Sequence, residues 1–230
     1  MAMLRFPVRA LRALAGTTLL LLIATSCKKP LEVAAAESLT LVSGGAQVRQ
    51  AGRLLRAPLV FRATDALGAG VAGVPITIVV VQGGGAVDSA SARTDANGEA
   101  RVKWTLGPDV AQAVQATIAE AEALRVTASG IVPSDIVVAQ GNNQTARVAI
   151  ALANNVVIRI LGGSNVPMDS VNVTFQIIGG GGAISPQSVL TNASGEATVK
   201  WTMGPVAGAN TAQVRAATID PVTISATATP

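Results

Sequence analysis

Few side chains in this sequence could carry out chemistry. The 230 residues include no His, no Tyr and a single Cys, Cys27, and 50% of the chain is apolar. Without His, a Ser-His-Asp triad, a Cys-His pair and an imidazole metal site are excluded, and one Cys allows no intramolecular disulfide. We therefore expect a protein that is not an enzyme, with no cofactor and no small-molecule substrate.

One short segment has the oxygen ligands of a cation loop. Asp95, Asn97 and Glu99 alternate in Asp95-Ala96-Asn97-Gly98-Glu99, as calcium ligands would. A hairpin turn explains the same residues, with Asn-Gly supplying the positive φ angles that such a turn needs. A related segment further along the chain has Asn192, Ser194 and Gly195, which keeps the turn chemistry but lacks the carboxylate. We favour the turn and predict no metal site.

Two other patterns are weaker. Gly68, Gly70 and Gly73 fit the spacing Gly-x-Gly-x-x-Gly, but a dinucleotide-binding loop must lead into a helix, and Val74-Pro75-Ile76-Thr77-Ile78 predicts a strand. Glu120 and Glu122 form a carboxylate pair without a neighbouring aromatic or third polar partner, which is typical of a solvated strand face. Neither pattern indicates a site.

Binding to nucleic acids or sugars also lacks the necessary residues. Three of the 17 basic residues, Arg5, Arg9 and Arg12, lie near the N-terminus, so the chain from Cys27 onward has 14 basic and 13 acidic residues. This part of the sequence has no cluster of basic residues interleaved with aromatic residues, which nucleic-acid binding would need. We predict no nucleic-acid partner. The aromatic residues after Cys27 are Phe61, Trp104, Phe175 and Trp201, and their positions in apolar patterns predict core packing rather than a platform for sugars.

The N-terminus has the features of an export signal. Residues 1–12 bear Arg, residues 13–24 are apolar, and small residues follow. About twelve apolar residues are too few to span a bilayer, which needs about 20. Ala24-Thr25-Ser26-Cys27 resembles a bacterial lipobox, although Leu is commoner at the place of Ala24. The resemblance implies a signal peptide over 1–26 and lipidation at Cys27, which would then anchor the mature chain in a membrane.

A tether follows over residues 27–37. It begins Lys28-Lys29-Pro30. In Gram-negative lipoproteins, Asp directly after the lipidated Cys is associated with retention at the inner membrane. Lys28 at that place therefore favours, by resemblance, an outer-membrane lipoprotein of the cell envelope.

The rest of the sequence is an internal duplication. A shift of 97 residues aligns residues 38–108 with 135–205 without a gap, and 18 of the 35 positions in 74–108 are identical. Beyond this, the second copy carries about three extra residues near Gly208. The only candidate linker is 131–134, which predicts one domain over 38–132 and another over 133–230.

Both copies have the period of strands. Ala100, Val102, Trp104 and Leu106 alternate with polar residues, and the second copy repeats this at residues 197–203. Further strands are predicted over 59–64, 74–82 and 114–119, separated by Gly and Asn/Asp turns. Short strands at this spacing predict an all-β fold of two tandem antiparallel β-sandwiches.

These segments resemble the group 1 bacterial immunoglobulin-like domain, the repeat of invasin and intimin-type proteins. The resemblance rests on Ala72 to Thr77, Gly83 to Gly85, Thr94 to Ala100 and Trp104 to Gly107, with matches at Val171 to Thr174, Gly179 to Gly182, Thr191 to Ala197 and Trp201 to Gly204. The second copy departs at 162–165, where the first has Thr64-Asp65. Members are mostly extracellular spacers or adhesive stalks, and no catalytic residue carries over.

The sequence thus predicts a lipid-anchored, non-catalytic envelope protein whose tandem immunoglobulin-like domains form a structural or adhesive surface module. An accessory lipoprotein that binds a glycan or a partner protein through its loops is the alternative. The identity of a partner, the loops that would bind it, the oligomeric state, and periplasmic or surface display stay open.

Overall fold

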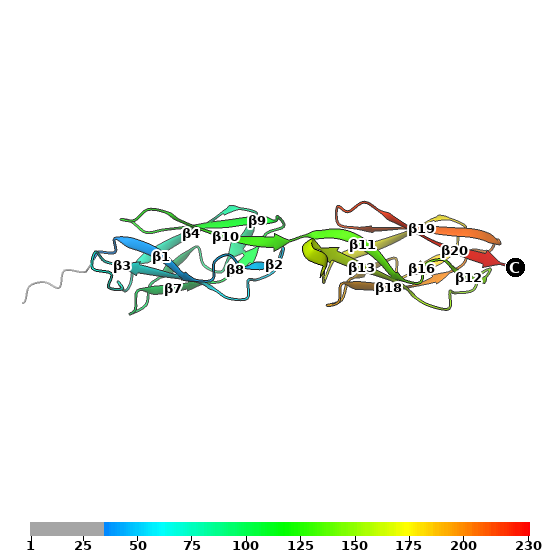
Figure 1. The fold of residues 1–230 in the computed structure, drawn as a ribbon, viewed down its shortest axis with the longest axis horizontal. Coiled ribbons are helices and arrows are strands. Elements are labelled where there is room, and N and C mark those ends of the chain that lie inside the picture. Colours follow the sequence, from blue (N-terminus) through cyan, green and yellow to red (C-terminus); the bar gives the residue numbers. More distant parts are fainter. Residues whose placement is uncertain (1–34) are drawn as a thin grey trace, which may run out of the picture. The chain divides into compact units, whose positions relative to one another are not determined.

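The computed structural model describes residues 35–230, which lie in one compact unit. Each copy of the duplication forms two packed sheets (Figure 1). The strands of the first copy are β1 (Ser38–Ser43), β2 (Val48–Gln50), β3 (Leu59–Thr64), β4 (Pro75–Gln82), β5 (Gly85–Val87), β6 (Ser91–Arg93), β7 (Glu99–Val102), β8 (Trp104–Leu106), β9 (Ala111–Thr117) and β10 (Leu124–Ile131).

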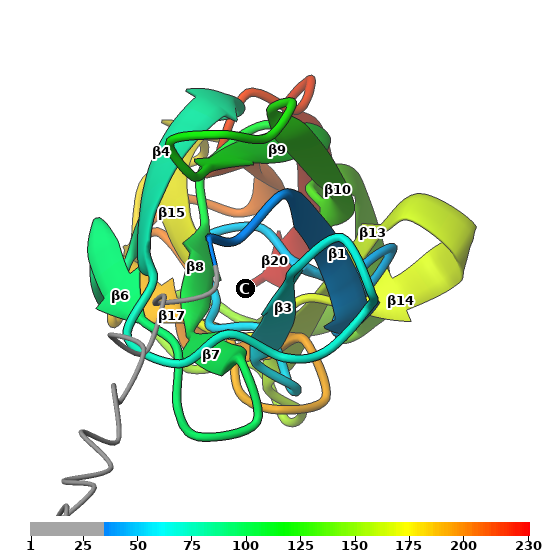
Figure 2. The same cartoon turned by 90° about the vertical axis from the view of Figure 1, so that its left-hand side faces the viewer.

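The first sandwich has the sheets β1-β3-β7 and β2-β10-β9-β4-β6, with β5 and β8 as an additional pair. Figure 2 shows β4, β9 and β10 on one side and β3 and β7 on the other. Pairing is antiparallel throughout except between β2 and β10, which run parallel.

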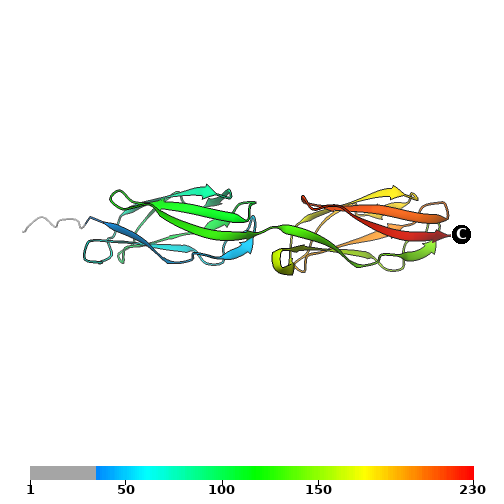
Figure 3. The same cartoon turned by 45° about the horizontal axis from the view of Figure 1, so that its top comes forward.

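The second copy repeats this arrangement. Its elements are β11 (Pro133–Gln140), β12 (Gln144–Arg147), β13 (Val156–Gly162), the 3-10 turn η1 (Gly163–Asn165), β14 (Val166–Pro167), β15 (Asn172–Gly179), β16 (Ala183–Ser185), β17 (Ser188–Leu190), β18 (Glu196–Thr202), β19 (Gly208–Ala216) and β20 (Val222–Thr229). The sheets are β11-β13-β18-β16, with β14 beside β13, and β12-β20-β19-β15-β17. Figure 3 shows β19 and β20 side by side in orange and red. The predicted fold class, two tandem immunoglobulin-like sandwiches, is confirmed.

Each sandwich has its own apolar core. One core is built from residues between Leu39 and Ala128, and the other from residues between Ile136 and Ala228. Alternate residues of the strands point into these cores, so that β18 reads as buried at Ala197, Val199 and Trp201 and exposed at Thr198 and Lys200.

Several strand limits differ from those predicted. The strand predicted over 114–119 is β9, which begins at Ala111 because Ala111 already pairs with Ser129. The strand predicted through Ala100–Leu106 is divided at Lys103, whose N–H donates to Asp88 Oδ1 at 2.9 Å. The second copy has Ser185 in place of Asp88, and β18 continues unbroken.

The pairing register also corrects the length of the insertion. Ile78 pairs with Ala116 in the first sandwich, and its equivalent Phe175 pairs with Val214 in the second. The shift between copies is thus 98 residues in β9 and β19, so one extra residue precedes β19 rather than three.

Candidate functional site

Cys27, the predicted lipidation site, lies outside the described residues, as do the predicted signal peptide and most of the tether. The last tether residues are described. Ala36 packs against the first core, and the N–H of Glu37 donates to the Thr64 carbonyl at 2.9 Å. The chain is therefore fixed to the sandwich from about Ala36 onward. Within residues 35–230, no helix has the length and apolarity to cross a membrane.

The side chain of Asp95 is held in a turn by backbone N–H groups of the residues that follow it. Its Oδ1 accepts the N–H of Asn97 at 2.8 Å and that of Glu99 at 2.9 Å, and Gly98 N donates to the Asp95 carbonyl at 3.0 Å. These bonds favour the ionised carboxylate and lower the pKa of Asp95. Only Gly98 has a positive φ, +77°, so the expectation of positive φ at both Asn97 and Gly98 was wrong.

The second copy builds the same turn without a charge. Asn192 Oδ1 accepts the N–H groups of Ser194 at 2.9 Å and Glu196 at 3.0 Å, and Gly195 has φ +75°. The amide oxygen of Asn192 therefore accepts the same two hydrogen bonds as the carboxylate of Asp95, which supports the turn interpretation. Across residues 35–230, no three His, Cys, Asp or Glu side chains lie close enough to hold a metal ion.

The other polar patterns lie in exposed loops. Gly68 is part of a turn in which Asp65 Oδ1 accepts the N–H groups of Leu67 and Ala69, each at 2.9 Å, and Gly73 leads into β4. Glu120 and Glu122 lie in the loop between β9 and β10, not on the strand face that we expected. The structure brings neither set of residues together as a site.

The four aromatic residues are core residues, as predicted. Trp104, Trp201 and Phe61 are 0% exposed, and Phe175 is 5% exposed. Both indole N–H groups are buried without a hydrogen-bond partner among the described residues. Within 35–230, no aromatic ring is thus exposed for stacking on a sugar.

The junction between the sandwiches carries polar contacts that the sequence did not predict. Only Val132 separates β10 from β11. The Arg53 guanidinium pairs with the carboxylate of Asp169 and donates to Ser170 Oγ at 2.9 Å. Gln50 Nε2 donates to the Asp169 carbonyl at 2.7 Å. Three side-chain hydrogen bonds therefore link loops that lie well over 100 residues apart in sequence.

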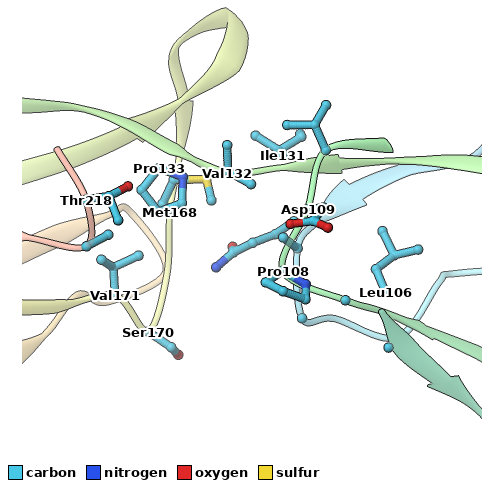
Figure 4. A pocket seen from close by; sticks show the side chains of 17 residues that line it. Leu106, Pro108, Asp109, Ile131, Val132, Pro133, Met168, Ser170, Val171 and Thr218 are labelled. Carbon is cyan, nitrogen blue, oxygen red and sulfur yellow. The ribbon is translucent and has the colours of Figure 1, made fainter. Parts of the chain in front are cut away.

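A groove of about 870 Å³ lies beside these contacts. In Figure 4, Pro108 and Asp109 of the first sandwich face Pro133, Met168 and Val171 of the second. Its lining is mainly apolar.

The departure noted at 162–165 also lies at the junction. A Cβ added to Gly162 would lie 2.7 Å from Ile131 Cγ2 and 2.8 Å from the Val132 carbonyl oxygen. Asp65, the equivalent residue of the first copy, would therefore not fit here. The loop differs between copies because the chain from the first sandwich passes directly over it.

A signal for the junction exists in the sequence. Arg53 and Asp169 correspond to Ile150 and Ala72 in the other copy, so at these two positions only the faces that meet carry a charge. Comparing the copies by charge would have identified the pair.

No protein-family model and no curated protein sequence matches the chain. Among solved structures, the chain is similar to the D0-D1 domain of intimin, at 20% identity over 83% of this chain and 95% of that one, with a TM-score of 0.35. It is also similar to the Yersinia pseudotuberculosis adhesin InvE, at 17% identity over 84% of this chain and 59% of that one, with a TM-score of 0.45. Domains 4 and 5 of the S-layer protein SbsC are 13% identical over 85% of this chain and 99% of that one, with a TM-score of 0.41. The immunoglobulin-like fold itself follows from the strand order rather than from these similarities.

Proposed function

We propose that this chain is a lipid-anchored protein of the cell envelope whose two immunoglobulin-like sandwiches act as a structural or adhesive surface module. In this proposal residues 1–26 are removed as a signal peptide, Cys27 is acylated, and residues 27–37 tether the domains 38–132 and 133–230. Lys28 after the Cys favours the outer membrane, with the domains displayed at the surface.

The observation that carries the proposal is the junction. A spacer has to keep its domains in a defined relation, and a one-residue connection with the bonds of Gln50 and Arg53 to Asp169 and Ser170 supports that requirement. The side chains that could have done chemistry have structural roles instead. Asp95 closes a turn, and Trp104 and Trp201 fill cores. These assignments support a non-catalytic module.

The lipid anchor is tested at Cys27. We expect Cys27→Ala to abolish incorporation of labelled fatty acid and to release the protein from the membrane fraction, because two or three acyl chains provide stable anchoring at about 0.8 kcal/mol per buried methylene. Cys27→Ser is the matched variant and should behave alike. Continued labelling and membrane fractionation of both variants would rule out the lipobox interpretation.

The junction groove supports a second candidate, an accessory lipoprotein that binds a glycan or a protein through its loops. Val110 lines the groove and is 55% exposed. In this case Val110→Asp should abolish capture of an envelope partner while leaving the melting temperature unchanged. Equal capture by Val110→Asp and the unmodified protein would eliminate the groove as the binding surface.

A further inference from the structure

Each sandwich has two loop faces. We define the trailing face as residues 50–53 and 106–110 in the first sandwich, and 147–150 and 203–207 in the second. The leading face is residues 71–74 in the first sandwich and 168–171 in the second. At the junction, the trailing face of the first sandwich contacts the leading face of the second. The other two faces make no such contact within residues 35–230.

Equivalent residues of the two trailing faces have the same backbone setting. Leu106 N donates to the Arg53 carbonyl at 3.0 Å, and Met203 N donates to the Ile150 carbonyl at 3.0 Å. Ile150 therefore stands where the first sandwich has Arg53.

The leading faces correspond in the same way. Thr94 Oγ1 donates to the Val71 carbonyl at 2.7 Å, and Thr191 Oγ1 donates to the Met168 carbonyl at 2.6 Å. Ala72, which follows Val71, therefore stands where the second sandwich has Asp169.

The residues that correspond to the two members of the junction ion pair are thus both apolar on the faces that make no such contact among residues 35–230. Ile150 is 55% exposed, and Val206, which follows Pro205 as Asp109 follows Pro108, is 70% exposed. Single exposed aliphatic residues are ordinary, but here both positions that correspond to the junction ion pair are apolar, so the two faces match each other as the two junction faces do.

We propose that the trailing face of the second sandwich binds the leading face of the first sandwich of another copy of this chain. The contact would follow the internal junction, with Ile150 of one copy against Ala72 of the next in place of Arg53 against Asp169.

Charge supports this choice of partner. The trailing face of the second sandwich keeps Arg147 at the place of Gln50 and contains no acidic residue. Asp65, whose N–H donates to the Ala69 carbonyl, and Asp95, which follows Thr94, lie next to the first leading face, and Glu120 corresponds to Thr218, which lines the junction groove in the second sandwich. Arg93, which donates to the Gly73 carbonyl, is the nearby cation. Opposite charges on the two faces favour this pairing over two trailing faces, which would bring two Arg147 side chains together.

A contact between unlike faces leaves one free face of each kind at its ends, so it extends into a row unless its rotation closes a ring. This inference specifies the structural role in the proposed function, since the nine tether residues 27–35 that precede the fixed part of the chain reach at most about 32 Å and would hold such a row along a membrane. The contact itself does not depend on the anchor.

The test is sedimentation velocity of the full chain over a range of concentrations, with detergent micelles in excess so that the anchor contributes equally to every variant. We expect the unmodified protein to associate as its concentration rises. Ile150→Arg and Ala72→Asp should each weaken association several-fold, because each replaces an apolar side chain of the contact by a charge that gives up part of its hydration without a partner at that position, and this cost outweighs the longer-range attraction of the facing loops. The double variant Ile150→Arg/Ala72→Asp should restore association, because it recreates the pair that Arg53 and Asp169 form. Leu190→Arg, at a residue that is 60% exposed in β17, is the control and should change nothing.

Three results would overturn the inference. The unmodified protein could remain monomeric at all concentrations. Ile150→Arg could weaken association while Ala72→Asp does not and the double variant fails to restore it, which would indicate two trailing faces in contact. All variants could associate equally, which would place the association in the anchor. Failure of the lipid proposal is distinguishable, because Cys27→Ala would then keep its membrane behaviour while the pattern of loss and restoration stayed the same.

Discussion

The two sandwiches follow one sequence pattern, and their loops differ most clearly where the two sandwiches meet. The cores agree, with Trp104 and Trp201 each fully buried and Thr94 and Thr191 making the same bonds to a neighbouring loop. The turns at Asp95 and Asn192 agree although one is charged. Residues that are identical in the two copies, such as these Trp and Thr residues, are therefore ones that the fold requires.

The loops that meet at the junction have diverged for steric and electrostatic reasons. Gly162 replaces Asp65 because a side chain would collide with Ile131 and Val132. Arg53 and Asp169 form an ion pair, and their equivalents Ile150 and Ala72 do not. At the junction, the divergence between the copies therefore follows from the contacts of each face.

The largest expected effect tests the shared core. Trp104→Ala and Trp201→Ala should each lower the free energy of unfolding of their own sandwich by about 3–5 kcal/mol, because each removes a fully buried ring. Chemical denaturation of the full chain measures this. Native emission from both indoles should be blue-shifted and resistant to quenching. A red-shifted, quenchable emission would contradict the buried assignment and favour sugar binding.

Both copies have a buried amide side chain at equivalent positions, but its length and its hydrogen bonds differ. Gln112 Oε1 accepts Gly107 N at 3.0 Å, and its Nε2 donates to the carbonyls of Asp109 at 2.6 Å and Gly83 at 3.2 Å. In the second copy, the shorter Asn210 bonds Gly204 N at 3.0 Å and the Gly208 carbonyl at 3.2 Å, with one extra residue in the loop.

Gln112→Asn should therefore destabilise the first sandwich by about 1–3 kcal/mol, because the shorter side chain leaves a buried group unpaired. Asn210→Gln is the matched change and should also destabilise, because the longer side chain has to fit a position at which Asn210 is already 0% exposed. Thermal denaturation of both variants provides the measurement. Neutral results for both would show that side-chain length and loop length are not coupled.

The junction pair is expected to contribute less. Arg53 and Asp169 side chains are 38% and 41% exposed, so Arg53→Ala should cost at most about 1 kcal/mol of stability. Its clearer effect should be on the coupling between the unfolding of the two sandwiches. Their two calorimetric transitions should move apart in temperature. Arg159→Ala, which removes the pair with Glu196 inside the second sandwich, is the control for loss of a partly exposed pair. Equal separation of the transitions in both variants would contradict a coupling role for Arg53.

The smallest effect concerns the charge of Asp95. Because its pKa is lowered in the fold, the ionised carboxylate stabilises the first sandwich above the usual pKa of 3.8, and this contribution is lost as pH falls through the lower folded value. Asp95→Asn, which copies Asn192, should leave the melting temperature nearly unchanged at neutral pH and remove that part of the acid dependence. The second sandwich should not change.

Calcium provides the companion measurement. Melting in chelator and in millimolar calcium should coincide for both sandwiches, since a ligand of the native state alone would raise stability. A calcium-dependent rise that disappears in Asp95→Asn would make Asp95 a ligand.

The sequence predicted the parts of the fold that repeat locally. Alternation around Trp104 and the turn residues Asp95 and Gly98 are local signals, and the copies confirm each other. The break at Lys103 was missed because it depends on the side chain of Asp88, 15 residues away. The junction was missed because Arg53 and Asp169 belong to different sandwiches, and the lipidation site is predicted from sequence alone.

The most direct test of the central claim is protease treatment of intact cells that express the full chain. If Cys27 anchors a surface-displayed module, a broad-specificity protease should cut the tether between residues 28 and 37, and the folded sandwiches should appear in the supernatant while a periplasmic marker stays intact. Release only after the outer membrane is permeabilised would contradict surface display. Recovery of the chain in the soluble fraction without any protease would contradict the anchor itself.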